Sequence, residues 1–127
     1  MPVRSLNSSV LKWPDANEVE SAVREWARAT ANEHHLLILL GYFGSYARGD
    51  AGVGSDLDLV AIVESSPRPF ERRALDWDLS PLPLPAEILV YTQEEWDRMQ
   101  SEGSRFARTL AEETVWVWKR PQAVTAT

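Results

Sequence analysis

The chain has no cysteine among its 127 residues, which excludes disulfide bonds and thiolate metal sites. No apolar run approaches the length of a membrane span, and the run at residues 36–40 is far too short for one. The N-terminal residues lack the sustained apolar segment of a secretory signal. These absences favour a cytoplasmic protein.

An excess of positive charge is also missing, because 19 acidic residues outnumber 13 basic ones and give a net charge of −6. Binding to nucleic-acid backbones depends largely on cationic side chains. We therefore expect no direct nucleic-acid binding and exclude a template-reading polymerase. With 44% hydrophobic and 25% charged residues, we expect one globular domain over residues 1–127, with flexible ends at 1–12 and 121–127.

The most informative segment, residues 44–58, lies between two apolar runs. These runs, 36–43 and 57–63, have the composition of buried strands. Only ten residues separate Ser45 from Asp56, whereas a parallel crossover generally needs about a dozen or more. The two strands are therefore predicted to be antiparallel, with a short helix between them.

The dipeptide Gly44-Ser45 stands where the first strand ends and the short helix begins. Exposed backbone N–H groups at such a point attract phosphate, and glycine allows a close approach to the backbone. The Ser45 hydroxyl adds a hydrogen-bond donor, and Arg48, one turn along, adds positive charge. This arrangement predicts a phosphate site at Gly44, Ser45 and Arg48.

Asp56 and Asp58 place two carboxylates at the start of the second strand. Because side chains alternate along a strand, the two carboxylates point the same way, about 7 Å apart at the backbone. Oxygen ligands of this kind suit Mg²⁺, and two such ions about 4 Å apart can assist both the attacking and the leaving oxygen. A phosphate site beside metal-binding carboxylates indicates phosphoryl or nucleotidyl transfer.

Gly-Ser followed after ten residues by Asp-x-Asp resembles the signature of the DNA polymerase beta-like nucleotidyltransferase superfamily. The longer string GSYARGDAGVGSDLDLVAIV is similar to its minimal single-domain branch, the MNT proteins. The resemblance implies an α+β fold, with a mixed β-sheet of about four strands packed with helices in a two-layer domain. It also implies Mg²⁺-dependent binding of ATP or another nucleoside triphosphate, and transfer of a nucleoside monophosphate with loss of pyrophosphate.

By the same resemblance, Gly44 and Ser45 hold phosphates, Asp56 and Asp58 hold metal, and a later strand supplies a third acid. The candidate is Glu87 in the segment PAEILVYT, where relatives usually carry Asp. Glu87 would bind a metal ion and take the acceptor proton. The alternative is an ordinary exposed acid at a strand start. If Glu87 faces away from the two aspartates, we expect a weak or inactive enzyme.

The resemblance further implies a partner protein, because minimal family members often act as antitoxins that bind and nucleotidylate a helical HEPN toxin. We accordingly expect a hydroxyl acceptor on such a partner, and a homo- or hetero-oligomer. The alternative is a catalytically weak or inactive protein-binding module with the same fold. Glu87 and the tryptophan-rich final strand, residues 114–118, motivate that alternative.

The remaining elements are predicted from capping and periodicity. Asp15 and Glu18 form a capping-box variant before a helix that ends near Asn32, and Thr92 with Glu95 forms another. The first helix carries an apolar stripe at helical spacing, made of Val19, Val23, Trp26, Ala27 and Thr30. A break is predicted at Gly103.

Two pairs of polar residues receive structural rather than functional interpretations. His34 and His35 precede a strand, and adjacent strand residues face opposite ways, so one is expected half-buried and the other exposed. Arg72 and Arg73 could hold a triphosphate, but a solvated helix face is the favoured interpretation. Asp50 is interpreted as a turn residue.

Overall fold

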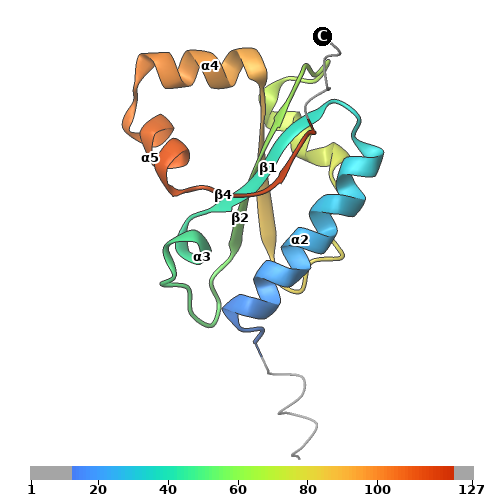
Figure 1. The fold of residues 1–127 in the computed structure, drawn as a ribbon, viewed down its shortest axis with the longest axis vertical. Coiled ribbons are helices and arrows are strands. Elements are labelled where there is room, and N and C mark those ends of the chain that lie inside the picture. The colour runs from blue at the N-terminus through green and yellow to red at the C-terminus, as the bar shows by residue number, and fades with distance from the viewer. Residues whose placement is uncertain (1–12, 122–127) are drawn as a thin grey trace, which may run out of the picture.

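The computed structural model describes residues 13–121, which form one four-stranded sheet flanked by helices (Figure 1). The strands, in the spatial order β3-β2-β1-β4, are β1 (Leu37–Phe43), β2 (Leu57–Val63), β3 (Ala86–Thr92) and β4 (Val115–Lys119). β1 is antiparallel to both β2 and β4, whereas β2 and β3 are parallel. This mixed sheet confirms the predicted fold class. The flexibility predicted for 1–12 and for most of 121–127 concerns residues outside the described range.

The connection between β1 and β2 contains the predicted short helix, α3 (Ser45–Arg48). Because the connection is short, the two strands pair antiparallel, with Phe43 opposite Asp58 at the end nearest α3. Gly49 ends α3 in the left-handed conformation, with φ 83°, which glycine adopts without a steric penalty. The spacing argument from the sequence is therefore confirmed.

Helix α2 (Ala16–Glu33) packs on one face of the sheet. Its capping box is present, because the Glu18 N–H donates to the Asp15 carboxylate at 2.8 Å and the Asp15 N–H donates to Glu18 at 2.9 Å. The buried side chains of α2 are those predicted: Val19, Val23, Trp26, Ala27 and Thr30. They contact the face of β2 that carries Leu57 and Leu59.

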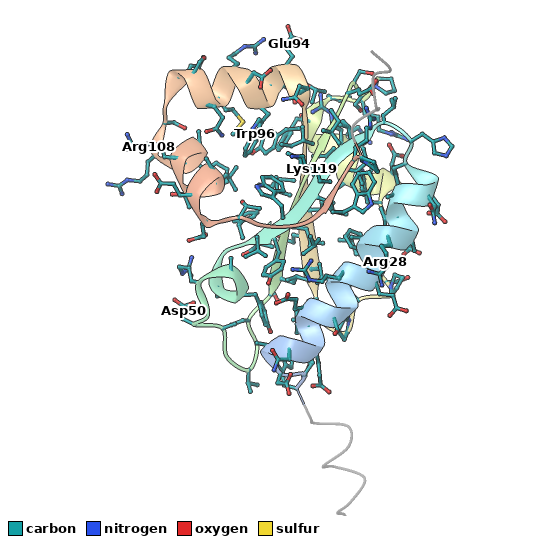
Figure 2. All side chains as sticks on the ribbon, in the orientation of Figure 1. Arg28, Asp50, Glu94, Trp96, Arg108 and Lys119 are labelled. Atoms are coloured by element: carbon teal, nitrogen blue, oxygen red, sulfur yellow. The ribbon has the colours of Figure 1, made fainter. Side chains whose placement is uncertain are left out.

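Helices α4 (Gln93–Glu102) and α5 (Arg105–Glu113) lie on the opposite face of the sheet, separated at Gly103 as predicted. Trp96 points from α4 toward the sheet (Figure 2), with its ring 5.8 Å from that of Trp116 on β4. Strand alternation places the fully buried Val60 and Ile62 on this face. The structure thus adds a helical layer to the two layers predicted.

Gly41 allows β1 and β4 to approach closely. A Cβ atom at Gly41 would lie 2.6 Å from the Val115 carbonyl oxygen, 2.8 Å from Thr114 Cγ2 and 2.9 Å from Trp116 Cε3. The register between the two strands also shifts between Leu40 and Gly41. The seat of β4 on the sheet therefore depends on the absence of a side chain at this position.

The residues before β1 follow the structural interpretation. The His34 ring is partly buried and stacks on Trp77 with ring centroids 3.9 Å apart, whereas His35 is exposed. Burial lowers the pKa of His34, with Glu33 and Asp76 acting in the opposite direction. Stacking on Trp77 thus explains the partial burial of His34.

Arg73 corrects one prediction. It lies in η1 (Phe70–Asp76), a 3₁₀ helix, and it is only 6% exposed. Its two terminal nitrogens donate to the Glu95 carboxylate at 2.6 and 3.0 Å, and one also donates to the Val90 carbonyl at 3.0 Å. The solvated helix face predicted for the arginine pair is therefore right for the exposed Arg72 and wrong for Arg73. A carboxylate on α4, distant in sequence, supplies the partner that makes burial tolerable.

Over residues 13–121, none of the helices has both the length and the apolar character needed to cross a membrane.

We expect Glu95→Gln to lower the free energy of unfolding by about 1–3 kcal/mol at neutral pH, because Arg73 loses its charged partner. The hydrogen bond from Arg73 holds the pKa of Glu95 below its ordinary value. The stabilisation is therefore complete above that ordinary value and is lost as the pH falls through the lowered one. Urea unfolding of both proteins from neutral to strongly acidic pH measures this difference.

Glu94→Gln is the matched control, because Glu94 is an exposed neighbour in the same helical turn. Equal destabilisation by the two substitutions, or a difference that does not shrink in acid, would contradict the assigned role of the Arg73–Glu95 pair.

Candidate functional site

The site is organised by the turn at Gly44, directly after β1. Gly44 has φ 79° and ψ −151°, a conformation open essentially to glycine alone, and it is buried. A Cβ atom at this position would overlap with an oxygen of the Asp58 carboxylate. The missing side chain is therefore what allows Asp58 to lie directly against the turn.

Asp58 and Glu87 are neighbours across two strands. In the parallel pairing of β2 with β3, Asp58 is the direct partner of Glu87, so both side chains project from the same face of the sheet. Leu57 and Leu59, on either side of Asp58, are fully buried on the opposite face. Asp58 is partly buried, and Glu87 is exposed at the strand start. The structure thus brings Glu87 to the same side as Asp58.

Negative charge is concentrated around Asp58. Partial burial raises the pKa of Asp58, and the carboxylates of Glu87 and Asp56 raise it further. Arg48 acts in the opposite direction, and Glu113 raises the pKa again. Asp56 itself is exposed and directly precedes β2. Among residues 13–121, Asp58 is therefore the centre of a group of acids that Arg48 alone counterbalances.

Arg48 lies at the end of α3 and is held by two carboxylates. Its Nε donates to Asp50 at 3.1 Å, and its Nη1 donates to Glu113 at 3.4 Å. These hydrogen bonds, that to Asp50 first, raise the pKa of Arg48. Asp50 extends into solvent from the segment after α3 (Figure 2). Besides its predicted place in a turn, Asp50 forms an ion pair with Arg48.

Glu113 is a member of the site that the sequence did not indicate. It is the last residue of α5, and its Oε1 accepts a hydrogen bond from the Gly44 N–H at 2.9 Å. Its side chain is only 18% exposed. A glutamate at a helix end is usually a solvated charge, so no local pattern singles it out. Only the position of β4 next to β1 brings it to Gly44.

Ser45 is the first residue of α3 and is partly buried. Its carbonyl oxygen accepts the N–H groups of Gly49 and Asp50, at 3.0 and 3.1 Å. These bonds close the tight turn that follows and fix Ser45 beside Gly44. Gly44, Ser45 and Arg48 therefore lie in one tight turn, and the phosphate site predicted there stays a prediction.

The donor set around Asp58 fits a hard divalent cation in its chemistry, because all its members are carboxylate oxygens. As the side chains stand, no group of three or more His, Asp or Glu residues between 13 and 121 is gathered closely enough to hold one metal ion. Asp58 and Glu87 already share a face of the sheet, while Asp56 precedes β2 in an exposed position. A cation here would therefore have to draw these side chains together.

A pocket of about 340 Å³ lies between the start of α2 and the segment that contains α3. It is bordered by Trp13 and Asp15 before α2, by Tyr46, and by Gly49 to Val53. The Trp13 indole N–H donates to the Tyr46 hydroxyl at 3.1 Å. Neither Asp58 nor Glu87 lines this pocket, so it is separate from the acids.

Known proteins resemble this chain in sequence pattern and in fold. A family model described as nucleotidyltransferase domain matches residues 25–117, whereas no curated protein matches the chain. In fold, the chain is similar to a proposed nucleotidyltransferase from Sulfolobus solfataricus, with a TM-score of 0.60 and 22% identity over 86% of this chain and 91% of that one.

Two toxin–antitoxin structures are less similar. One contains AMP-PNP and has a TM-score of 0.48, with 15% identity over 76% of this chain and 73% of that one. The other is a mutant of the pair MntA-HpeT, with a TM-score of 0.45 and 13% identity over 80% of this chain and 73% of that one.

We expect Gly44→Ala to destabilise the protein by about 1–3 kcal/mol, because the new methyl group both strains the backbone and displaces the Asp58 carboxylate. Thermal unfolding measures this effect. Gly52→Ala is the control, since a Cβ atom at Gly52 meets nothing within 4 Å. A Gly44→Ala protein as stable as the control would refute the close contact between the turn and Asp58.

We expect Asp58→Asn to stabilise the protein slightly at neutral pH, by up to about 1 kcal/mol after solvent screening, because the substitution removes a partly desolvated charge that the neighbouring acids also repel. Since the pKa of Asp58 is raised in the folded state, its ionised form disfavours folding. The gain should therefore be absent in acid, should grow as the pH rises above the ordinary pKa of an aspartate, and should be complete above the raised pKa.

Chemical denaturation of wild type and Asp58→Asn from acid to neutral pH tests whether the substitution raises or lowers the free energy of unfolding. Asp97→Asn serves as the control, because Asp97 is an exposed acid on α4. A destabilised Asp58→Asn protein at neutral pH would contradict the picture of uncompensated charge.

Proposed function

Because the chain belongs to the nucleotidyltransferase domain family, whose model spans residues 25–117, we propose that it transfers a nucleoside monophosphate from ATP or another nucleoside triphosphate to a hydroxyl acceptor with the help of Mg²⁺. The match to this family confirms the resemblance found in the Gly-Ser and Asp-x-Asp motifs. The metal, the nucleotide and the acceptor belong to the proposal.

One observation carries the proposal: Asp58 lies in register with Glu87 and against the Gly44 turn. The acids expected to hold metal and the backbone expected to hold phosphate are thus immediate neighbours. The raised pKa of Asp58 also supports it, because a cluster of like charges gains stability when a cation binds between its members. A purely structural role gives no reason for such repulsion.

In this proposal the phosphate end of the nucleotide binds at α3. The Gly44 N–H and the Arg48 guanidinium donate to oxygens of the β- and γ-phosphates, and the Ser45 hydroxyl adds another donor. Arginine suits this role, because its fixed fork of N–H groups matches phosphate oxygens. These contacts orient the α-phosphate toward the acids on β2 and β3.

Asp56, Asp58 and Glu87 would hold Mg²⁺, in two sites. When bound, Mg²⁺ supplies positive charge beside the reacting phosphate. The acceptor oxygen forms a bond to the α-phosphorus while the bond from that phosphorus to the bridging oxygen breaks, and pyrophosphate leaves. The hydroxyl proton passes to the Glu87 carboxylate, which the exposed start of β3 leaves open to an acceptor.

We propose a hydroxyl on a partner protein as the acceptor. The net charge of −6 disfavours a nucleic-acid acceptor. The resemblance of the 44–63 segment to MNT antitoxins favours a helical HEPN-type toxin, which the protein would bind and modify. Soluble action in the cytoplasm, next to such a toxin, completes the proposal.

We expect wild-type protein to transfer label from α-labelled ATP to a co-expressed HEPN-type partner in the presence of Mg²⁺. Asp58→Asn and Asp56→Asn should each reduce this transfer by about 100-fold or more, because charge stabilisation of the reacting phosphate is lost. Asp97→Asn, on the remote helix α4, should transfer at the wild-type rate. Gel electrophoresis detects the labelled partner protein, and a pyrophosphate assay measures the second product.

Undiminished transfer by Asp58→Asn would remove the proposed metal site. Binding of the partner without label transfer or pyrophosphate release, by wild type as well as by the variants, would instead favour the protein-binding module considered from the sequence.

A further inference from the structure

Glu113 occupies the donors that the proposed function assigns to phosphate. Its two carboxylate oxygens are divided between them: Oε1 accepts from the Gly44 N–H at 2.9 Å, and Oε2 accepts from Arg48 Nη1 at 3.4 Å. A phosphate group bound at the Gly44 turn would present two oxygens to the same two donors. The Glu113 carboxylate is thus an internal anion in the position of a ligand anion.

The contact is well defined, because the backbone around Glu113 is fixed on both sides. Leu110, one turn earlier in α5, is fully buried, and Val115, two residues later, pairs with Tyr42 on β1. The Glu113 side chain is 18% exposed, so one side of it still reaches solvent. Rotation of the side chain alone would free both donors without movement of the helix or the strand.

The charges around Glu113 make this contact strained rather than optimal. Arg48 attracts it, but Arg48 is shared with Asp50 and is 50% exposed, so water weakens that attraction. Asp58 lies close enough for Glu113 to disfavour its ionised form. A ligand that brings its own cations would relieve this repulsion, whereas Glu113 adds to it.

We propose that Glu113 is an autoinhibitory latch: its carboxylate fills the phosphate site of the free protein, and a metal-bound triphosphate must displace it to bind. This inference rests on the proposed function, because it concerns the same site. A nucleotide therefore binds only if its contacts to Gly44 and Arg48 are stronger than those of Glu113. Ligands with a single phosphate and no metal gain too little from the exposed Arg48 to displace it.

Removal of the latch should tighten nucleotide binding. We expect Glu113→Ala and Glu113→Gln to bind Mg-ATP at least about tenfold more tightly than wild type, since a charge-assisted hydrogen bond no longer competes. In label transfer, KM should fall by a similar factor while kcat stays near the wild-type value. Isothermal titration calorimetry with Mg-ATP, and with inorganic triphosphate as a probe without a base, measures the affinity.

Glu112→Gln is the matched control, because it removes the same charge from the exposed neighbouring residue. It should leave the affinity for Mg-ATP unchanged. The amide resonance of Gly44 provides a readout independent of ligand: it should shift in ligand-free Glu113→Ala and stay in place in ligand-free Glu112→Gln. Thermal unfolding confirms that each variant is folded.

The outcomes separate the latch from the proposed function. Weaker or unchanged Mg-ATP binding in both Glu113 variants, with binding by wild type intact, would overturn the latch and leave the nucleotidyltransferase site standing. Loss of Mg-ATP binding in Glu113→Gln would make Glu113 part of the binding machinery instead. Failure of every protein, Glu113→Ala included, to bind Mg-ATP would overturn the proposed function and the latch with it.

Discussion

The parallel pairing of β2 with β3 is the constraint on which the site depends. It sets Asp58 directly beside Glu87, and the hydrogen bond from the Leu57 N–H to the Pro85 carbonyl extends the pairing to the strand start. A shift by one residue would turn Glu87 to the opposite face, into the layer that contains α2. The buried residues Ile88 and Val90 oppose such a shift, because it would carry them out of the core.

The far end of β3 is fixed by a different device. Arg73 bridges the Val90 carbonyl and the Glu95 carboxylate, so that η1, β3 and the start of α4 share one buried cation. The ion pair of Arg73 with Glu95 therefore anchors the end of β3 by charge, whereas Ile88 and Val90 anchor the strand by apolar packing. The pairing of β2 with β3 therefore does not depend on Asp58 and Glu87, whose carboxylates repel each other.

Much of this arrangement could be predicted from local sequence. Ten residues between Ser45 and Asp56 are too few for a crossover, which gives antiparallel strands, and strand alternation puts Leu57 and Leu59 on the face opposite Asp58. The capping boxes were equally readable, because both partners lie within one helical turn. The assignment of Mg²⁺ to Asp56, Asp58 and Glu87 stays a prediction.

The residues that sequence reasoning missed are those with distant partners. Glu113 is 69 positions from Gly44, and Arg73 is 22 positions from Glu95. Each resembles an ordinary exposed charge when only its neighbours in sequence are considered. What distinguishes them is supplied by the packing of strands and helices, which fixes the environment only after the chain has folded. The sequence shows the charge of Glu113 and Arg73, but it does not show that Glu113 is partly buried, that Arg73 is buried, or which groups they contact.

Gly41 connects packing to this site without any polar group of its own. Because Gly41 has no side chain, the Thr114 and Trp116 side chains pack directly against the backbone of β1. Glu113 immediately precedes Thr114. A methyl group at position 41 would push the start of β4 outward and carry the end of α5 with it. The position of the Glu113 carboxylate thus depends on an apolar position in mid-strand, so a substitution of Gly41 in the core would disturb the hydrogen bond at Gly44 from a distance.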